Sequence, residues 1–254
     1  MHFETVRYET RDDTAVITFN RPQYKHAISL ELSEEMGQAV DLAVKSGDIR
    51  FIVLTGTEAV FSSGADFSNP EKAVTMIRRE LDINSGDSPI AKLIHSPKPT
   101  IAAVNGYALG HGAEYAIMCD MIVASDRAEF GFIGPIRGVT CPYAMIRLAD
   151  EVGRAKAKEL ILTCERISAE EALKIGLVNH VVPQERLMET VFELIGKLRR
   201  AGPLAARYTK EVINRKLDGY EVSAKIFEEI VQSAEAFEGA AAFLEKRDPC
   251  WINF

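Results

Sequence analysis

The sequence has few cysteines and histidines, and neither type is arranged as a site. Its four cysteines are scattered without a C-x-x-C pair, so the sequence indicates neither a disulfide framework nor a zinc site. Its five histidines show no H-E-x-x-H or similar ligand spacing. We therefore expect no metal.

Long apolar runs and an excess of basic residues are also missing. No stretch approaches the roughly 18 apolar residues of a membrane span, and the start MHFETVRYETRDD lacks the basic-then-apolar order of a signal peptide. The formal net charge of -7 repels polyanions, which argues against nucleic-acid binding as the main task. We expect a cytoplasmic protein that engages neither membrane nor nucleic acid.

What is present is the composition of a compact domain. Hydrophobic residues make up 47% and charged residues 26% of the 254 residues, which argues against disorder and fits one large α/β domain. Short β-rich runs alternate with helical periodicity in the first part, and the later part is mostly helical. The expected strands cover 15–19, 51–55, 100–104 and 121–124, and the expected helices include 29–45, 184–201, 203–217 and 220–246.

Two glycine-bearing turns follow expected strands. The first reads S-S-G-A-D over 62–66, and the second reads N-G-Y-A-L-G-H-G-A-E over 105–114. Ligand sites gather at the carboxyl ends of strands in α/β sheets, and backbone N–H groups at such turns can stabilise an oxyanion. Glu114 in the second turn is either a general acid or base, or a carboxylate that only favours a helix start.

Several segments, in order, resemble the crotonase (enoyl-CoA hydratase/isomerase) superfamily over essentially the whole chain. The segments that carry the resemblance are N-R-P at 20–22 with H-A-I at 26–28, F-S-S-G-A-D at 61–66, the run 98–114, C-D at 119–120, E-F-G at 129–131, R-I-S-A at 166–169 and F-L-E-K-R at 243–247. Each segment is weak alone, but the ordered set is specific.

The resemblance implies an α/β fold built as a stack of ββα units, with a C-terminal helical region used in trimers. Residues 1–200 would form the core with the acyl-CoA site, and residues 201–254 the helical region of the same single domain. The resemblance further implies a homotrimer or hexamer. It implies no permanently bound cofactor, with coenzyme A entering as part of the substrate.

The resemblance also assigns roles to single residues. Backbone amides of Ala65 and His111 would form the oxyanion hole, and Glu114 would transfer protons. Contacts to the substrate or its coenzyme A would come from Lys25, Ala27, Ser63, Ala65, Asp66, Phe227 and Lys246, the last two reaching the site of a neighbouring subunit.

Two positions depart from the family pattern. His111 replaces the usual glycine at the second oxyanion position, and its ring either packs or takes part in proton transfer. Gly134 stands where hydratases carry a second glutamate, and because glycine supplies no acid or base, we expect slow hydration. Arg137, Thr140 and Tyr143 are nearby polar candidates for the acyl pocket, as is Cys141. An arginine there either holds a substrate carboxylate or braces the loop.

Three functions stay open at this point. The first is an enzyme of the enoyl-CoA hydratase/isomerase type, a lyase or isomerase, that works through a thioester enolate with one catalytic glutamate. The second is a decarboxylase of a malonyl-CoA-like thioester, because 138–143 faintly resembles the G-V-P-Y of family decarboxylases that act on methylmalonyl-CoA. The third is a catalytically silent acyl-CoA-binding subunit.

Overall fold

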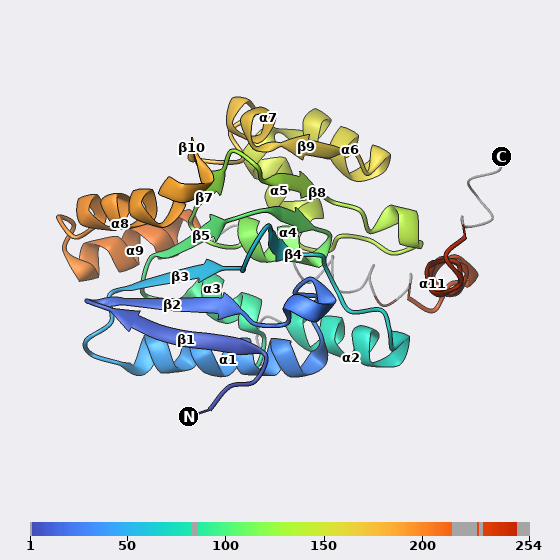
Figure 1. The fold of residues 1–254 in the computed structure, drawn as a ribbon, viewed down its shortest axis with the longest axis horizontal. Helices are drawn as coiled ribbons and strands as arrows, with labels where there is room; N and C mark the ends of the chain where they lie inside the picture. The colour runs from blue at the N-terminus through green and yellow to red at the C-terminus, as the bar shows by residue number, and fades with distance from the viewer. Residues whose placement is uncertain (1, 83–85, 215–227, 229–230, 248–254) are drawn as a thin grey trace.

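Two sheets organise the chain (Figure 1), and the computed structural model describes residues 2–82, 86–214, 228 and 231–247. In these residues the larger sheet has the strand order β1-β2-β3-β5-β7-β10, and the smaller sheet has the order β4-β6-β8-β9. The strands are β1 (Val6–Arg11), β2 (Thr14–Phe19), β3 (Phe51–Thr55), β4 (Val60–Ser62), β5 (Thr100–Val104), β6 (Tyr107–Leu109), β7 (Met121–Ser125), β8 (Glu129–Gly131), β9 (Arg166–Ser168) and β10 (His180–Val182).

The central strands of the larger sheet, such as β3 and β5, are buried on both faces, which explains their near-continuous apolar sequences. Strands β1 and β2 pair antiparallel, and the other neighbours in this sheet pair parallel. Along β3, Val53 points to a cluster under helix α8 (Leu187–Leu198), whereas Ile52 and Leu54 point to the main core. This alternation follows from the two-residue period of a strand. The four strands expected from the sequence are confirmed within one residue at each end.

Helix α1 (Leu30–Lys45) confirms the first expected helix. The Ser29 side chain caps it by accepting a hydrogen bond from the Leu32 N–H at 3.3 Å. Its buried stripe includes Leu32, Met36, Val40 and Ala43 and packs into the main core. The three- and four-residue spacing of that stripe is the pattern that predicted it.

The smaller sheet positions the site. Each of β4, β6 and β8 follows a strand of the larger sheet, β3, β5 and β7, so the chain passes repeatedly from one sheet to the other. Because β4, β6 and β8 pair in parallel, their carboxyl ends emerge at one edge. Gly106 permits the crossing before β6, since a Cβ there would lie 1.9 Å from the Ala59 carbonyl oxygen.

The remaining helices surround the sheets, and α11 (Ala234–Glu245) lies apart from the sheets near the C-terminus (Figure 1). They are α2 (Pro70–Leu81), α3 (Pro89–His95), α4 (His111–Ile117), α5 (Ala144–Val152), α6 (Arg154–Thr163), α7 (Ala169–Lys174), α9 (Pro203–Ile213) and α11, with short 3-10 turns η1 (Pro22–Tyr24), η2 (Pro135–Arg137) and η3 (Gln184–Arg186). Helix α11 contacts η2. Within the described ranges, none of the helices combines the length and apolar character needed to cross a bilayer.

The expected continuous helix over 220–246 is interrupted in its described part, although α11 confirms helix over Ala234–Glu245. Residues 231–233 form a turn, and α11 begins only at Ala234. The physical reason is a capping side chain: Ser233 Oγ accepts the Ala236 N–H at 3.1 Å, which starts a new helix. The division of the chain near residue 200 stays a prediction.

Candidate functional site

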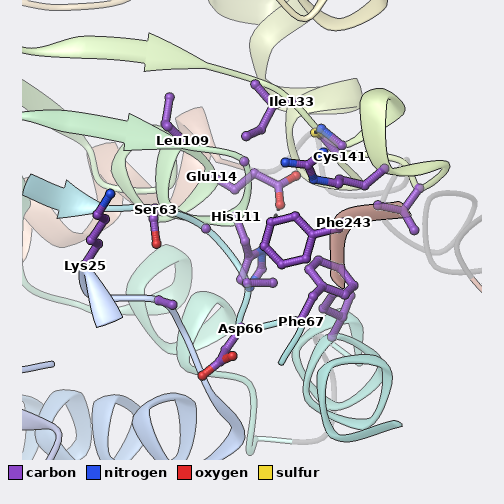
Figure 2. A pocket seen from close by; sticks show the side chains of 18 of the residues that line it. Lys25, Ser63, Asp66, Phe67, Leu109, His111, Glu114, Ile133, Cys141 and Phe243 are labelled. Carbon is purple, nitrogen blue, oxygen red and sulfur yellow. Dashed lines mark hydrogen bonds and ion pairs between the residues drawn. The ribbon is translucent and has the colours of Figure 1, made fainter. Parts of the chain in front are cut away.

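Three segments meet at the carboxyl ends of β4, β6 and β8. They are the turn 63–66, the turn at Gly110, and the loop 132–143, and they enclose a cavity of about 440 Å³ (Figure 2). The lining includes most of the residues expected from the sequence: Lys25, Ala27, Ser63, Ala65, Asp66, His111, Glu114, Gly134, Arg137 and Thr140. The parallel order of the small sheet therefore brings together residues that are far apart in the chain.

Three expected residues are not in this lining. Tyr143 is fully buried behind the cavity, where its hydroxyl donates to the Glu80 backbone carbonyl. Lys246 lies at the exposed C-terminal end of α11. Phe227 lies outside the described residues. The roles of Lys246 and Phe227 at a neighbouring subunit stay predictions.

Glycines let the two turns approach closely. A Cβ on Gly64 (φ +105°) would lie 2.9 Å from the Leu109 carbonyl oxygen and 3.6 Å from the His111 nitrogen. A Cβ on Gly112 would lie 2.6 Å from the Ser62 Cβ. The segment carrying Ala65 is thereby held against the first residue of α4. Among the described residues, neither the Ala65 N–H nor the His111 N–H has an acceptor.

The Glu114 carboxylate borders the cavity and is held at both oxygens. Its Oε1 accepts the N–H of Tyr143 at 2.8 Å and the N–H of Ala144 at 3.0 Å. These amides begin α5, so the positive end of that helix faces the carboxylate. Its Oε2 accepts from His111 Nδ1 at 2.8 Å. The side chain is 2% exposed, so the carboxylate is oriented by the protein rather than by bulk water.

His111 links Glu114 to a second buried carboxylate, Glu80. The His111 Nε2 donates to Glu80 Oε2, and the hydroxyls of Ser33 and Tyr115 both donate to Glu80 Oε1, the latter at 2.7 Å. Glu80 is 0% exposed, and its carboxylate oxygens receive three donors. The result is a buried series of side-chain hydrogen bonds, Glu80–His111–Glu114, that ends at the cavity.

The charge of the His111 ring follows from this series of hydrogen bonds. Burial alone would lower the pKa of His111, but the charges of Glu80 and Glu114 and its hydrogen bonds to both raise that pKa to about 10. At neutral pH the ring is therefore an imidazolium between two carboxylates. The packing role considered from the sequence is incomplete, because both ring nitrogens are hydrogen-bonded.

Sequence reasoning missed Glu80, although a signal was present. Helix α2 buries Ala73, Met76, Ile77 and Leu81 on one stripe, and Glu80 lies on the same stripe. A charged residue on the buried face of an amphipathic helix needs a charged or hydrogen-bonding partner. The partner itself is not readable from the sequence, because His111 comes from a distant turn.

Gly134 occupies the position where hydratases of the family carry a second glutamate, and the surrounding loop leaves no space for a side chain there. The Gly134 N–H donates to Cys141 Sγ at 3.4 Å, and a Cβ on Gly134 would lie 2.8 Å from that sulfur and 2.9 Å from the Thr140 carbonyl oxygen. The backbone path of loop 132–143 therefore leaves no room for a side chain at residue 134. Burial raises the pKa of the Cys141 thiol, which keeps it protonated.

Asp66 is the other carboxylate in the described lining. It is paired with Arg21 at 2.9 Å and accepts the Ser68 hydroxyl at 2.6 Å. Burial opposes ionisation, but the hydrogen bonds from Ser68 and Arg21 lower the pKa of Asp66 below its ordinary value. Within the described ranges no group of three or more His, Cys, Asp or Glu side chains is placed to hold a metal ion.

Comparisons with known proteins agree with this arrangement. The sequence profile described as enoyl-CoA hydratase/isomerase matches residues 9–253. A probable mitochondrial enoyl-CoA hydratase of Dictyostelium discoideum is 35% identical over 260 residues, covering 99% of this chain and 92% of that protein.

Two solved structures are similar along the chain. Carnitinyl-CoA hydratase from Mycobacterium avium has a TM-score of 0.84 and 31% identity and covers 100% of both chains. A methylmalonyl-CoA decarboxylase in complex with 2-nitronate-propionyl-CoA has a TM-score of 0.81 and 28% identity and covers 98% of both chains. The α/β fold expected from the sequence resemblance is confirmed.

Proposed function

The chain belongs to the enoyl-CoA hydratase/isomerase family, and from that premise we propose that it moves a proton on an acyl-CoA thioester through an enolate, with Glu114 as the acid–base group. Membership makes it an acyl-CoA enzyme of the crotonase superfamily. Family membership alone does not specify whether the reaction is hydration, isomerisation or decarboxylation. The residues around the cavity favour double-bond isomerisation over hydration.

The thioester carbonyl would accept hydrogen bonds from the Ala65 and His111 backbone amides. Both residues line the cavity, and their backbone N–H groups have no acceptor among the described residues. Donors fixed before the reaction stabilise charge that develops on the carbonyl oxygen. That charge arises when a C–H bond breaks and its electron pair moves through the α-carbon to the thioester oxygen.

Glu114 would accept the proton lost from carbon and return it. One oxygen is occupied by two amides and the other by a single donor from His111, which leaves a lone pair available at Oε2. The imidazolium balances the negative charge of Glu114, and Glu80 in turn holds the imidazolium. Proton removal from the α-carbon and delivery to the γ-carbon by one carboxylate converts a 3-enoyl thioester into the conjugated 2-enoyl thioester.

The single observation that carries this proposal is that the loop leaves no space for a second glutamate side chain at Gly134. Hydration benefits from a second group that activates water, whereas moving a proton between two carbons needs only one. Among the described lining residues, Asp66 is the remaining carboxylate, and it is committed to Arg21 and Ser68. Glu114 therefore acts without a second general base.

The test compares two thioesters. With trans-3-hexenoyl-CoA, the protein should form the conjugated thioester, followed by its ultraviolet absorbance. With crotonyl-CoA, hydration should be slower by about 10²-fold or more, since one general acid–base group contributes about 10²- to 10⁴-fold. Faster hydration than isomerisation would contradict the proposal.

A decarboxylase is the second candidate, because the chain is similar to a methylmalonyl-CoA decarboxylase structure over 98% of its length. Loss of carbon dioxide would itself generate the enolate, and Glu114 would then only protonate it. Carbon dioxide release from methylmalonyl-CoA would favour this candidate. Thioester binding without conversion across an acyl-CoA panel would favour the silent binding subunit.

Further proposals concern coenzyme A and assembly. Lys25, Ala27 and Ser63 line the cavity on the side of the first turn, where they would contact the coenzyme A portion. A homotrimer or hexamer and a cytoplasmic location stay predictions, and the similar Dictyostelium discoideum protein is named mitochondrial.

A further inference from the structure

Arg137 is a cationic side chain of the cavity that has no anionic partner among the described residues. Arg137 ends η2, is half-buried, and lines the same cavity as Glu114. Its guanidinium carbon lies 4.5 Å from the centre of the Phe243 ring, and no ion pair of the described residues includes Arg137. Arg166, another arginine of the lining, faces Glu129 at 3.4 Å. The Arg137 guanidinium is therefore available to bind an anionic group of a ligand.

A polar atom near Arg137 in sequence is also unsatisfied. Thr140 Oγ1 is buried and has no hydrogen-bond partner among the described residues, and Thr140 lines the cavity. A buried hydroxyl left without a partner is unfavourable, so such atoms in native proteins usually meet a ligand or water. Burial is the sole cause that lowers the pKa of Arg137, which agrees with the absence of a compensating carboxylate.

The rest of this wall is apolar and lies away from the coenzyme A side. Figure 2 shows Lys25 and Cys141 on opposite sides of Glu114, and Cys141 belongs to the loop that also carries Arg137 and Thr140. The neighbouring lining residues on this wall include Ile133 and Phe243. The wall therefore combines one guanidinium and one hydroxyl with hydrocarbon, the pattern of a site that recognises an acyl chain ending in a charged group.

We infer that the acyl group of the substrate carries a second carboxylate, distant from the thioester, which Arg137 and Thr140 bind. The planar guanidinium offers two parallel N–H donors to such a carboxylate, and the hydroxyl offers a third. The stacked Phe243 ring holds the guanidinium in one plane. This inference rests on the proposed function, because it assumes that the thioester carbonyl lies at Ala65 and His111.

Binding measurements test the inference without requiring turnover. Calorimetry would compare glutaryl-CoA with its ω-methyl ester, which keeps the chain and coenzyme A but removes the distal charge. A hydrogen bond to a charged group contributes about 1.5–3 kcal/mol, so the parent should bind the acid about 10- to 150-fold more tightly. Succinyl-CoA and adipyl-CoA, with their esters, would establish the preferred chain length.

Variants would show which residues cause the tighter binding of the acid than of its ester. Arg137→Met keeps an unbranched apolar stem over Phe243 and should reduce the ratio of acid to ester affinity to nearly one. Thr140→Val, which has the same shape, should reduce the ratio about 2- to 12-fold, as expected for a neutral hydrogen bond. Arg166→Met is the matched control in the same lining and should keep the preference.

Two results would overturn the inference. One is equal affinity of the parent for acid and ester at all three chain lengths. The other is that Arg137→Met weakens acid, ester and free coenzyme A by the same factor, which would mean that Arg137 binds a phosphate of coenzyme A. Failure of the proposed function is separate, because it would appear as absent proton transfer while the binding ratio remains measurable.

Discussion

Replacing Glu80 with glutamine tests whether the buried series of hydrogen bonds behind Glu114 controls the active-site charge. Glu80→Gln keeps the length of the side chain but removes one of the two negative charges beside His111. An amide has one oxygen, so it cannot accept from Ser33, Tyr115 and His111 together as the carboxylate does. The pKa of His111, about 10 in the parent, should therefore fall.

The size of the fall follows from the separation of the charges. Two unit charges about 4 Å apart interact by about 4 kcal/mol at an effective dielectric constant of about 20. This energy corresponds to about three pKa units and is the upper end of the effect. An opposite charge at this distance typically shifts a pKa by about 1–3 units, so we expect a His111 pKa of roughly 7 to 9 in the variant.

Two assays read this shift. Nitrogen NMR of labelled histidine would report the protonation of His111 directly. The rate of proton transfer as a function of pH should show its alkaline decline at roughly 7 to 9 instead of near 10, because a neutral ring no longer balances the charge of Glu114. Glu71→Gln is the control, since Glu71 is exposed on the same helix.

An unchanged His111 pKa in folded Glu80→Gln would refute the reasoning. So would a shift of equal size in Glu71→Gln, because an exposed carboxylate is screened by water. If the NMR shift occurs but the pH–rate profile does not move, Glu80 controls the ring without affecting the reaction.

Three further predictions concern packing, pH and assembly. Gly134→Ala should lower the free energy of unfolding by about 1–3 kcal/mol in urea titrations, and Gly134→Glu should gain no crotonyl-CoA hydration, because a Cβ there lies 2.8 Å from Cys141 Sγ. The pKa of His111 is raised from 6.5 to about 10 in the folded protein, so its contribution to stability is complete below pH 6.5 and is lost as the pH rises towards 10. The difference in unfolding free energy between the parent and His111→Asn should therefore shrink over that pH range. A constant difference would argue against an imidazolium. Light scattering should show a trimer or hexamer, and Lys246→Ala should weaken coenzyme A binding; a monomer, or a variant with unchanged affinity, would count against the assembly prediction.

The sequence predicts the four central strands of the larger sheet, β2, β3, β5 and β7, because they are largely buried. Runs such as 51–55 and 100–104 are apolar apart from one threonine each and end at glycine-bearing turns, so they are recognisable alone. The three-residue strands of the smaller sheet, such as β4 and β6, are too short to show a period. Their pairing depends on the larger sheet bringing them together, so it could not be predicted from local pattern.

The candidate site divides in the same way. Ala65, His111 and Glu114 lie in turns whose glycines mark them in the sequence, and the structure gathers them around one cavity. Glu80 has no such mark apart from its place on a buried stripe, and its side-chain partners come from two other helices, α1 and α4. The lack of space for a side chain at Gly134 likewise depends on the path of a loop that sequence alone does not define.

Deuterium exchange at the α-carbon of butyryl-CoA in heavy water tests the central claim most directly, because it reports enolate formation for a thioester that cannot be hydrated or isomerised. The parent should exchange, and Glu114→Gln should exchange about 10²- to 10⁴-fold more slowly with little change in thioester affinity. Glu170→Gln, an exposed first-turn glutamate of α7, is the control and should match the parent. Exchange by folded Glu114→Gln at the rate of the parent would contradict the account.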